Sequence, residues 1–440
     1  MLKITKFGGS SVASAEQFKK VKNIIESDPA RRFVVISAVG KRNAKDNKIT
    51  DLLYLCHAHI EYHVDYLPLF QMIEQRFLEI KQELGLSVPI EAELRQLETR
   101  LPELSLDELV SRGEYFTSKL MADYLDFPFV DAKDVISMRY DGTFNYEDTS
   151  EKLKTVLGTC RQFVMPGFYG STPDGHVRVM PRGGSDITGS ILARCLHADV
   201  YENWTDVSGF LMADPRIVKN PKNIDRITYS ELRELSYMGA GVLHEDAVYP
   251  IRKSNIPIHI LNTNRPQDPG TIILGSIPED DGGPIITGIA GKKDFCAVEI
   301  YKKHMSNSVG IVRRALSVFE KYNVSIEHIP SGIDSFSIVV HAEDVRSNIY
   351  EIIADIKEEL KTDDIRLVEG IALIATVGRN MNRRPGTSGR LFGALGTSGV
   401  NIRMIAQGSD EINIIVGVEN NDFEKAISII YHNFVEEEQI

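Results

Sequence analysis

The sequence has few of the residues that mark secreted, metal-binding and membrane proteins. Its four cysteines, Cys56, Cys160, Cys195 and Cys296, lie far apart and lack the spacing of a metal site, which suits a reducing cytosol. No apolar run reaches membrane-spanning length, and Met1 leads straight into an expected strand. We therefore expect neither a signal peptide nor a transmembrane helix, no membrane partner, and a cytoplasmic location.

Positive charge is also scarce, because 50 Lys and Arg stand against 62 Asp and Glu, a net charge of −12. Without a basic face we expect no nucleic-acid partner. Two phosphate-binding motifs are missing as well: no G-x-x-x-x-G-K-[ST] occurs, and no G-x-G-x-x-G follows a strand. With 440 residues, 42% hydrophobic and 25% charged, the chain is long and apolar enough for two or three globular domains.

What the chain does have is a strand, a glycine turn and a helix within its first 25 residues. The strand ends in Lys6, and Gly8 and Gly9 follow at once. Glycine lets backbone N–H groups approach an oxyanion closely, and the N-terminus of the next helix favours negative charge. The stretch is either a phosphate cradle or an ordinary strand-to-helix turn.

A second buried strand, residues 32–39, leads into a basic loop at 40–48 that is either solvated or placed to neutralise a nucleotide. Residues from about 56 to 125 repeat apolar positions at helical spacing. Gly113 interrupts this pattern, which permits close approach and draws attention to Glu114. We expect no metal site at His57 and His59, which point to different faces of the helix.

A second glycine loop, Pro181 to Asp186, also opens a helix, and Thr205 and Asp206 follow another strand. Ligands bind at the carboxyl ends of strands in open α/β sheets. Strands alternate with helices up to about residue 275, which predicts a mainly parallel sheet with helices on both faces. The polar, turn-rich stretch 277–284 is the expected linker.

The remaining residues contain a repeat with an offset of 76, as in 386 − 310 = 76. Gly310 pairs with Gly386, and Gly332 pairs with Gly408. Each copy predicts a ferredoxin-like βαββαβ unit without catalytic groups. The tail is either a ligand-sensing or oligomerisation module, or a purely structural dimer interface.

Four motifs together resemble the aspartokinases of the amino acid kinase family, and the doubled tail resembles paired ACT domains. The motifs are Lys6-Phe-Gly-Gly-Ser-Ser11, Arg182-Gly-Gly-Ser-Asp186, Trp204-Thr-Asp-Val207 and Asp214-Pro-Arg216. The resemblance implies an α/β fold with a mainly parallel, eight-stranded central sheet sandwiched by helices, plus two ferredoxin-like βαββαβ (ACT) units. It implies a catalytic domain at 1–283 and a regulatory tandem ACT region at 284–440, with units at about 294–366 and 370–440.

The resemblance further implies transfer of the γ-phosphoryl of MgATP to the side-chain carboxylate of L-aspartate, giving 4-phospho-L-aspartate. This step opens the route to lysine, threonine and methionine. Mg²⁺ is expected mainly on phosphates and water, so no metal-ligating residue is expected. The chain has no room for the homoserine dehydrogenase domain of some relatives, so a monofunctional enzyme is expected.

The same resemblance assigns site residues. Lys6 would hold the transferring phosphoryl oxygens, Asp186 would hold Lys6 or the loop, and Arg182 and Glu114 would take a substrate carboxylate and ammonium. The other substrate-binding residues would be Ser37, Thr50, Gly183, Gly184 and Ser185. The ATP-binding set would be Lys6, Phe7, Gly8, Gly9, Ser10, Thr205, Asp206, Phe210, Leu211, Met212, Asp214 and Arg216. The effector-binding set would be Ser308, Gly310, Ile311, Val312, Ser325, Ile326 and Glu327.

Two departures from the family pattern concern the nucleotide. Many relatives carry a phosphate-contacting lysine where this chain has Gly241, and Glu245 replaces a proline in the same stretch. Leu211 stands where a tyrosine near the base is usual. Either ATP binds more weakly or another cation substitutes, the candidates being Lys41, Arg42, Arg252 and Lys253.

The resemblance leaves the effector open between lysine and threonine, singly or together, and implies a homodimer or higher homo-oligomer through the ACT region. Two other functions compete with aspartate kinase. One is a kinase of the same fold for another acidic amino acid, such as glutamate. The other is an amino-acid sensor with weakened catalysis, which only Gly241 favours.

Overall fold

The computed structural model describes residues 1–181, 183–241, 243, 248–278 and 282–436. The chain forms two compact units: Met1–Phe210, Asn223–Tyr229 and Val242–Ile277 make the first, and Leu211–Lys222, Ser230–Gly241 and Pro278–Ile440 make the second. The expected division at residue 283 stays a prediction, and these two units follow a different boundary. Segments 211–222 and 230–241 join the C-terminal part because they bond to it; Ile289 N–H, for example, donates to the Met212 carbonyl at 2.7 Å.

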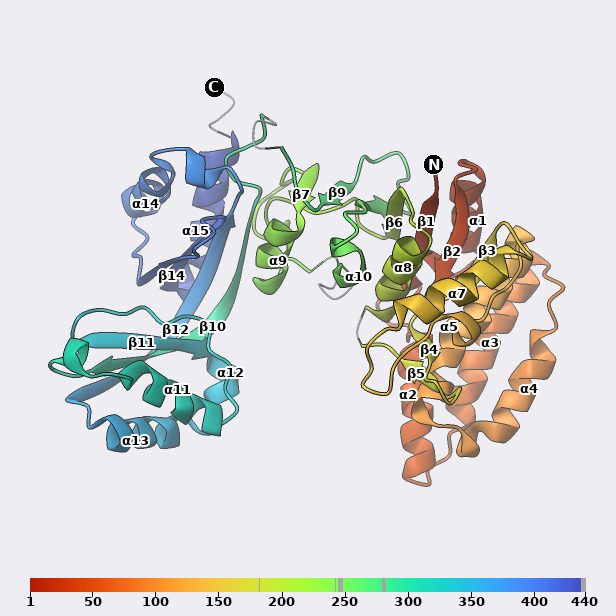
Figure 1. Cartoon of the computed structure of the whole chain (residues 1–440), viewed down its shortest axis with the longest axis horizontal. Coiled ribbons are helices and arrows are strands. Elements are labelled where there is room, and N and C mark those ends of the chain that lie inside the picture. Colours follow the sequence, from red (N-terminus) through yellow and green to blue (C-terminus); the bar gives the residue numbers. More distant parts are fainter. Residues whose placement is uncertain (182, 242, 244–247, 279–281, 437–440) are drawn as a thin grey trace. The chain divides into compact units, whose positions relative to one another are not determined.

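The central sheet of the first unit has the strand order β3-β2-β1-β6-β8-β9-β7 (Figure 1). Its strands are β1 Lys3–Phe7, β2 Arg31–Ile36, β3 Phe163–Pro166, β6 Val200–Thr205, β7 Arg226–Thr228, β8 Ile258–Asn262 and β9 Thr271–Leu274. Neighbouring strands run parallel except β8 and β9. The predicted mainly parallel sheet is confirmed, with seven strands in the described residues rather than eight.

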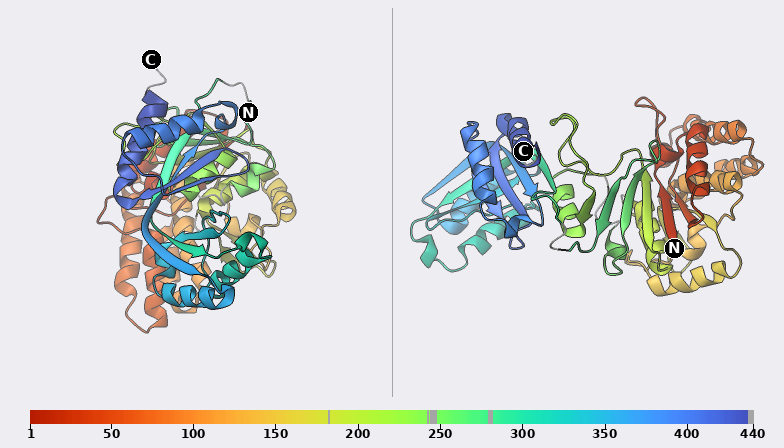
Figure 2. Two further views of the ribbon diagram at one scale, coloured as in Figure 1. Left: turned by 90° about the vertical axis from the view of Figure 1, so that its left-hand side faces the viewer. Right: turned by 90° about the horizontal axis from the view of Figure 1, so that it is seen from above.

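Helices cover both faces of this sheet (Figures 1 and 2). They are α1 Ala15–Glu26, α2 Ile49–Glu61, α3 Leu67–Leu84, α4 Ile90–Arg100, α5 Leu106–Leu125, α6 Ala132–Val135, α7 Tyr146–Leu157, α8 Gly184–Cys195 and α10 Tyr249–Arg252; a hairpin of β4 Tyr169–Ser171 and β5 Val177–Val179 is separate. Phe7 and Trp204 face a large apolar core that also takes in side chains of α1 to α5. Lys6 and Asn203, one residue along each strand, face α8 instead, because side chains alternate across a sheet.

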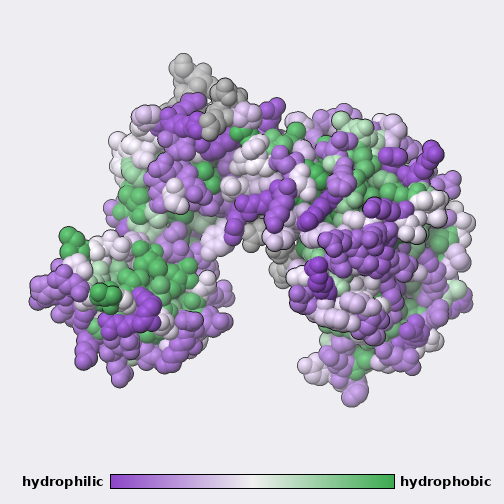
Figure 3. Space-filling model, in the orientation of Figure 1, coloured by the Kyte–Doolittle hydropathy of each residue, from purple (hydrophilic) through white to green (hydrophobic). Residues whose placement is uncertain are grey.

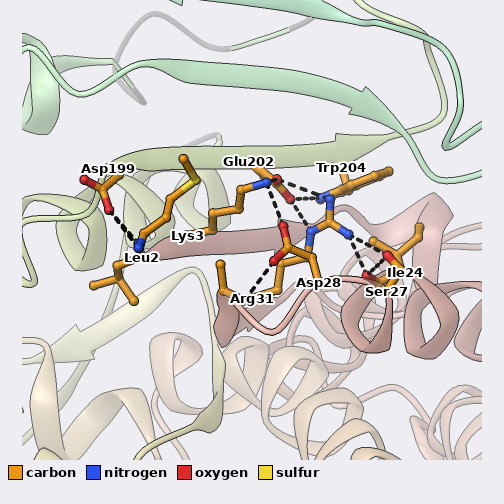
Figure 4. A network of polar contacts seen from close by, with 11 residues as sticks. Leu2, Lys3, Ile24, Ser27, Asp28, Arg31, Asp199, Glu202 and Trp204 are labelled. Atoms are coloured by element: carbon orange, nitrogen blue, oxygen red, sulfur yellow. Dashed lines mark hydrogen bonds and ion pairs between the residues drawn. The ribbon is translucent and has the colours of Figure 1, made fainter.

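Buried charges join β1, β2 and β6 on the core side (Figure 4). The Glu202 carboxylate, 1% exposed, accepts from Arg31 Nε at 2.8 Å and from Trp204 Nε1 at 2.9 Å. Lys3 Nζ lies 2.8 Å from Glu202 and 2.9 Å from Asp28. A buried carboxylate needs such partners, and this set fixes the register of the three strands.

The second unit contains one five-stranded antiparallel sheet with the order β11-β10-β12-β14-β13. Its strands are β10 Gly288–Tyr301, β11 Ser335–His341, β12 Asp364–Val377, β13 Met404–Gln407 and β14 Asn413–Glu419. Its helices are α9 Tyr229–Tyr237 (whose first residue belongs to the first unit), α11 Ile311–Lys321, α12 Ala342–Val345, α13 Ile349–Leu360, α14 Thr387–Thr397 and α15 Phe423–Tyr431.

The two βαββαβ units are interleaved rather than strictly consecutive. Residues 295–301 of β10 pair with β11, whereas residues 288–292 pair only with β12, at 373–377. The beginning of β10 thus occupies the place of the fourth strand beside β12, β14 and β13. The second βαββαβ unit is therefore not residues 370–440 alone. Residues 288–292, which precede the first βαββαβ unit, complete the sheet of the second.

Candidate active site

Five parallel strands of the first unit end at one edge of the sheet. The loops that follow them begin at Gly8 after β1, Ser37 after β2, Gly167 after β3, Asp206 after β6 and Thr263 after β8. Backbone hydrogen bonds continue across this edge, for example from Ser37 N–H to the Phe7 carbonyl at 3.1 Å and from Gly167 N–H to the Ile36 carbonyl at 2.9 Å. Residues separated by more than 150 positions in sequence therefore meet here.

Lys6 is the buried cation of this edge. It is 7% exposed, and its Nζ lies 2.5 Å from Asp186 Oδ1 and 3.5 Å from Asn203 Oδ1. Asn203 Nδ2 in turn donates to Asp186 Oδ1 at 2.9 Å. Asn203 was missed in the sequence, although its place in β6, two residues before Thr205, puts it on the same face of the sheet as Lys6.

In the first glycine turn, hydrogen bonds to neighbouring strands leave fewer N–H groups for a phosphate than the sequence predicted. Gly8 N–H donates to the Trp204 carbonyl at 3.0 Å, so it continues the sheet and is not free for a phosphate. The Phe7 side chain is buried against Trp204 in the core, and its carbonyl accepts from Ser37 N–H at 3.1 Å. The expected roles of these two residues are corrected accordingly. Gly9 and Ser10 open a short 3₁₀ turn, Gly9–Val12, whose first N–H groups have no acceptor within the turn.

A third glycine, Gly40, crosses the first turn. Its N–H donates to the Gly9 carbonyl at 3.0 Å. A Cβ on Gly40 would lie 2.5 Å from the Gly9 carbonyl carbon, so only glycine fits this crossing. This bond holds the loop that begins with Ser37 against the 3₁₀ turn Gly9–Val12, which we call the phosphate-side turn. Thr50, in the first turn of α2, is half-buried at the far end of the same loop.

Glu114 projects from α5 toward the end of β2. It is 5% exposed, and its Oε2 has no hydrogen-bond partner. Burial raises the pKa of Glu114 to about 8, and the Ala38 N–H offsets only part of this effect. Gly113 permits this placement, since a Cβ there would lie 3.0 Å from the Ala38 Cβ. A buried carboxylate with an empty oxygen is suited to a cationic ligand.

The second glycine loop enters α8 beside the end of β3. Gly183 has a φ of 78°, and Asp186 N–H donates to its carbonyl at 2.8 Å. Gly167 packs on Ser185 so closely that a Cβ on it would lie 2.7 Å from the Ser185 Cβ. Gly184 is buried in the same turn. Arg182, the expected carboxylate ligand, lies outside the described residues.

The expected nucleotide residues divide between the two units. Thr205 is half-buried and Asp206 exposed at the end of β6, and Phe210 is 1% exposed in the first unit. The remaining four, Leu211, Met212, Asp214 and Arg216, belong to the second unit. There Asp214 and Arg216 pair with each other at 2.6 Å. Their contacts with a nucleotide stay a prediction.

The candidates for the missing lysine differ in their surroundings. Arg42 is occupied, because its guanidinium pairs with Asp46 at 3.0 Å and with Glu79 at 3.1 Å. Lys41, Arg252 and Lys253 are exposed. Gly241 has open space where a side chain would begin, whereas Glu245 lies outside the described residues.

The expected effector residues of the second unit lie before, in and after α11: Ser308 to Val312 at its start, and Ser325 to Glu327 in the segment that follows its C-terminal end. Gly310 has a φ of 75° and precedes α11, and Ile311 is buried. Ser308, Val312 and Ile326 are half-buried, and Ser325 is exposed. Glu327 has a partner that the sequence did not predict: Tyr237, at the end of α9, donates its hydroxyl to Glu327 Oε2 at 2.8 Å.

No three His, Cys, Asp or Glu side chains in the described part of the chain are grouped so that they would hold a metal ion. No helix there is long and apolar enough to cross a membrane.

Comparison with known proteins gives consistent matches along the chain. The model of the amino acid kinase family matches residues 1–262, and a model of the ACT domain matches residues 374–434. The chain is 38% identical over 450 residues to Aspartokinase 3 of Bacillus subtilis (strain 168), covering 98% of each chain. It is 27% identical to the lysine-sensitive aspartokinase 3 of Escherichia coli (strain K12), covering 98% of this chain and 99% of that one.

Solved structures agree. The crystal structure of Clostridium acetobutylicum aspartate kinase matches with a TM-score of 0.93 and 49% identity over 98% of this chain and 100% of that one. E. coli aspartokinase III in complex with aspartate and ADP (R-state) matches with a TM-score of 0.74 and 25% identity over 98% of this chain and 99% of that one. The same enzyme in complex with lysine and aspartate (T-state) matches with a TM-score of 0.76 and 25% identity over 99% of each chain.

Proposed function

Because the chain belongs to the amino acid kinase family, and within it to the aspartokinases, we propose that it is a phosphotransferase that acts on L-aspartate. It transfers the γ-phosphoryl of MgATP to the side-chain carboxylate and forms 4-phospho-L-aspartate. This product would enter the synthesis of lysine, threonine and methionine. The observations that carry the proposal are the buried ion pair of Lys6 with Asp186 and the buried Glu114 carboxylate with one unpartnered oxygen, beside the loops that follow β1 and β2 at the same edge of the sheet.

The two sides of this edge suit the two substrates. Lys6 supplies positive charge where phosphoryl oxygens would lie, and Asp186 with Asn203 holds its ammonium in place. Phosphoryl transfer needs charge neutralisation and alignment more than covalent help. The acceptor carboxylate is already ionised at neutral pH, so no general base is required.

On the amino-acid side, Glu114 would take the substrate ammonium, and Ser37, Thr50 and Ser185 would supply hydrogen bonds around it. Arg182 would take a carboxylate, for which its planar guanidinium is suited. Without substrate the buried Glu114 carboxyl group is protonated at neutral pH. With the substrate ammonium beside it, Glu114 would ionise and form a buried ion pair. Substrate without an ammonium would leave the Glu114 carboxylate unmatched.

Mg²⁺ fits this edge as a companion of ATP. The ion would be held mainly by phosphate oxygens and water, and the Thr205 hydroxyl and the Asp206 carboxylate at the end of β6 would contact it through that water. When bound, the ion would neutralise charge on the phosphates.

Regulation by an end product would act through the second unit. Lysine and threonine are the proposed effectors, bound by the glycine turn before α11 and by the segment that follows this helix. An effector ammonium at Glu327 would compete with the Tyr237 hydroxyl, which now occupies Oε2. The coupling free energy between effector and active site would be about 1–3 kcal/mol, as is usual for such systems.

We also propose a homodimer or higher homo-oligomer formed through the regulatory sheet. Apolar side chains gather on the surface of the part that carries β11 and α11 (Figure 3). Val309 is 99% exposed and Ile333 76% exposed in this part of the chain. Burying such residues against a second copy would stabilise the assembly.

The test is ADP release, coupled to a spectrophotometric readout, with L-aspartate and L-glutamate as acceptors. The proposal expects turnover with aspartate and little with glutamate, and its loss in Lys6→Met. Preferred turnover of glutamate would establish the kinase for another acidic amino acid. No turnover, with lysine still bound, would establish the sensor.

A further inference from the structure

Arg76 is a buried cation of the first unit that the proposed reaction does not use. It lies on α3, is 6% exposed, and pairs through Nη1 with Asp46 Oδ2 at 2.6 Å. Its Nη2 donates to two backbone carbonyls, that of Gly40 at 3.0 Å and that of Ala13 at 3.2 Å. Burial of an arginine is costly unless its donors are matched, and here three acceptors take three of its five N–H groups.

These two carbonyls belong to the two loops that shape the active site. Ala13 ends the 3₁₀ turn that begins at Gly9, directly after Lys6, Phe7 and Gly8. Gly40 follows Ser37 and Ala38 in the loop after β2. The two loops already meet where Gly40 N–H donates to the Gly9 carbonyl at 3.0 Å. Arg76 reaches this crossing from α3 and donates to one carbonyl of each loop.

Asp46 extends the same arrangement to the rest of the basic loop. Its Oδ2 accepts from Arg76 and also from the backbone N–H and the Nε of Arg42, each at 3.0 Å. Burial opposes ionisation of Asp46, but the hydrogen bonds from Arg42 and the charge of Arg76 outweigh it and hold the pKa of Asp46 well below its usual range. The loop 40–46 is thus folded around the Asp46 carboxylate. The ion pair with Arg76 links this carboxylate to α3.

We propose that Arg76 is a positioning residue, which fixes the phosphate-side turn and the loop after β2 relative to each other. The inference rests on the proposed function, since these loops carry Gly9 and Ser10 on one side and Ser37 and Thr50 on the other. The guanidinium of Arg76 bonds to Asp46, Gly40 and Ala13, so it would act on the loops and not on a substrate. It acts on the distance between them, and a misplacement of about 1 Å at a reacting centre costs on the order of 100-fold in rate.

The guanidinium shape is part of the inference. One nitrogen serves the carboxylate while the other serves both carbonyls, and a lysine ammonium is a point charge that lacks this fork. Arg76→Lys keeps a positive charge beside Asp46 but gives up the bridge between Ala13 and Gly40. Charge alone therefore does not restore the function of Arg76.

The experiment compares Arg76→Gln and Arg76→Lys with Lys81→Gln. Lys81 is a matched control because it is also a cation on α3 that makes an ion pair. Its partner is Glu91, at 2.5 Å, which belongs to neither loop. In both Arg76 variants kcat should fall about 10- to 100-fold, while the KM values for ATP and aspartate change less than about threefold. The control should stay within about twofold of the wild type in all three constants.

Hydrogen exchange provides a readout that does not depend on turnover. Amides of residues 9–13 and 40–46 should exchange faster in the Arg76 variants, while those of β1, β2 and α5 keep their protection. A kcat per folded molecule equal to that of the wild type, or exchange that rises throughout α3 and the core, would overturn the inference. If Arg76→Gln does not fold, Asp46→Asn carries the same expectation. A wild type without turnover would reject the proposed function, and the exchange pattern would still decide whether Arg76 fixes the loops.

Discussion

Replacement of Glu114 by glutamine should stabilise the free protein. The folded protein keeps a proton on Glu114 up to about pH 8, whereas the unfolded chain releases it near 4.5. The folded state therefore binds more protons within this window, and stability falls as pH rises through it. At pH 7 the interval above 4.5 corresponds to a penalty of up to about 3 kcal/mol, which a neutral glutamine does not carry. Below about pH 4.5 both states are protonated and the advantage should vanish.

The same replacement should weaken the binding of aspartate. Only the ionised carboxylate attracts an ammonium, and with a pKa of about 8 the ionised fraction rises from a few per cent at about pH 6.5 to roughly three quarters at about pH 8.5. The wild-type KM for aspartate should fall on the order of 20-fold across this window, while the KM for ATP stays nearly constant. In Glu114→Gln the aspartate KM should be high and flat.

Two assays measure these effects on the same preparations. Urea unfolding at about pH 5 and about pH 7.5 gives the stability difference, and steady-state kinetics across the pH window gives both KM values. Glu83→Gln, an exposed change on α3, is the control and should alter neither. A wild-type aspartate KM that ignores pH, or a variant that raises the ATP KM as much as the aspartate KM, would refute the role given to Glu114.

Three further substitutions test other parts of the account. Lys6→Met should lower kcat by about 1,000-fold in a protein that still folds, and near-normal turnover would remove Lys6 from the mechanism. Gly40→Ala should lower both melting temperature and kcat because its Cβ would meet Gly9 at 2.5 Å; an unaffected enzyme would show that the crossing is not rigid. Tyr237→Phe frees Glu327 and should lower the half-inhibitory lysine concentration about threefold to tenfold, and unchanged inhibition would place the effector elsewhere.

The parts of the fold that sequence reasoning reached are those set by local pattern. Alternation of strands and helices predicted the parallel sheet, and glycines after strands predicted the loops at its carboxyl edge. Lys6 lies near the end of β1 and Asp186 in the first turn of α8, each next to a glycine turn, and the two side chains pair there. Glu114 could be singled out because Gly113 interrupts a helical pattern.

What sequence reasoning missed depends on contacts between distant segments. Nothing local in residues 288–292 indicates that they complete the sheet of the later βαββαβ unit, because a strand does not specify its partner. Segments 211–222 and 230–241 likewise belong with the five-stranded sheet of the second unit through bonds that only the fold reveals. In the sequence Gly40 is only one residue of a polar loop. A glycine is required there because the backbone of Gly9, 31 positions earlier, leaves no room for a Cβ.

The most direct test of the central claim traps the product. Purified protein with MgATP and L-aspartate is supplied with hydroxylamine, which converts an acyl phosphate into a stable hydroxamate whose position NMR can assign. The account predicts the side-chain hydroxamate of aspartate, formed by the wild type and not by Lys6→Met. ATP consumption without any hydroxamate, or a hydroxamate at the α-carboxyl group, would contradict it.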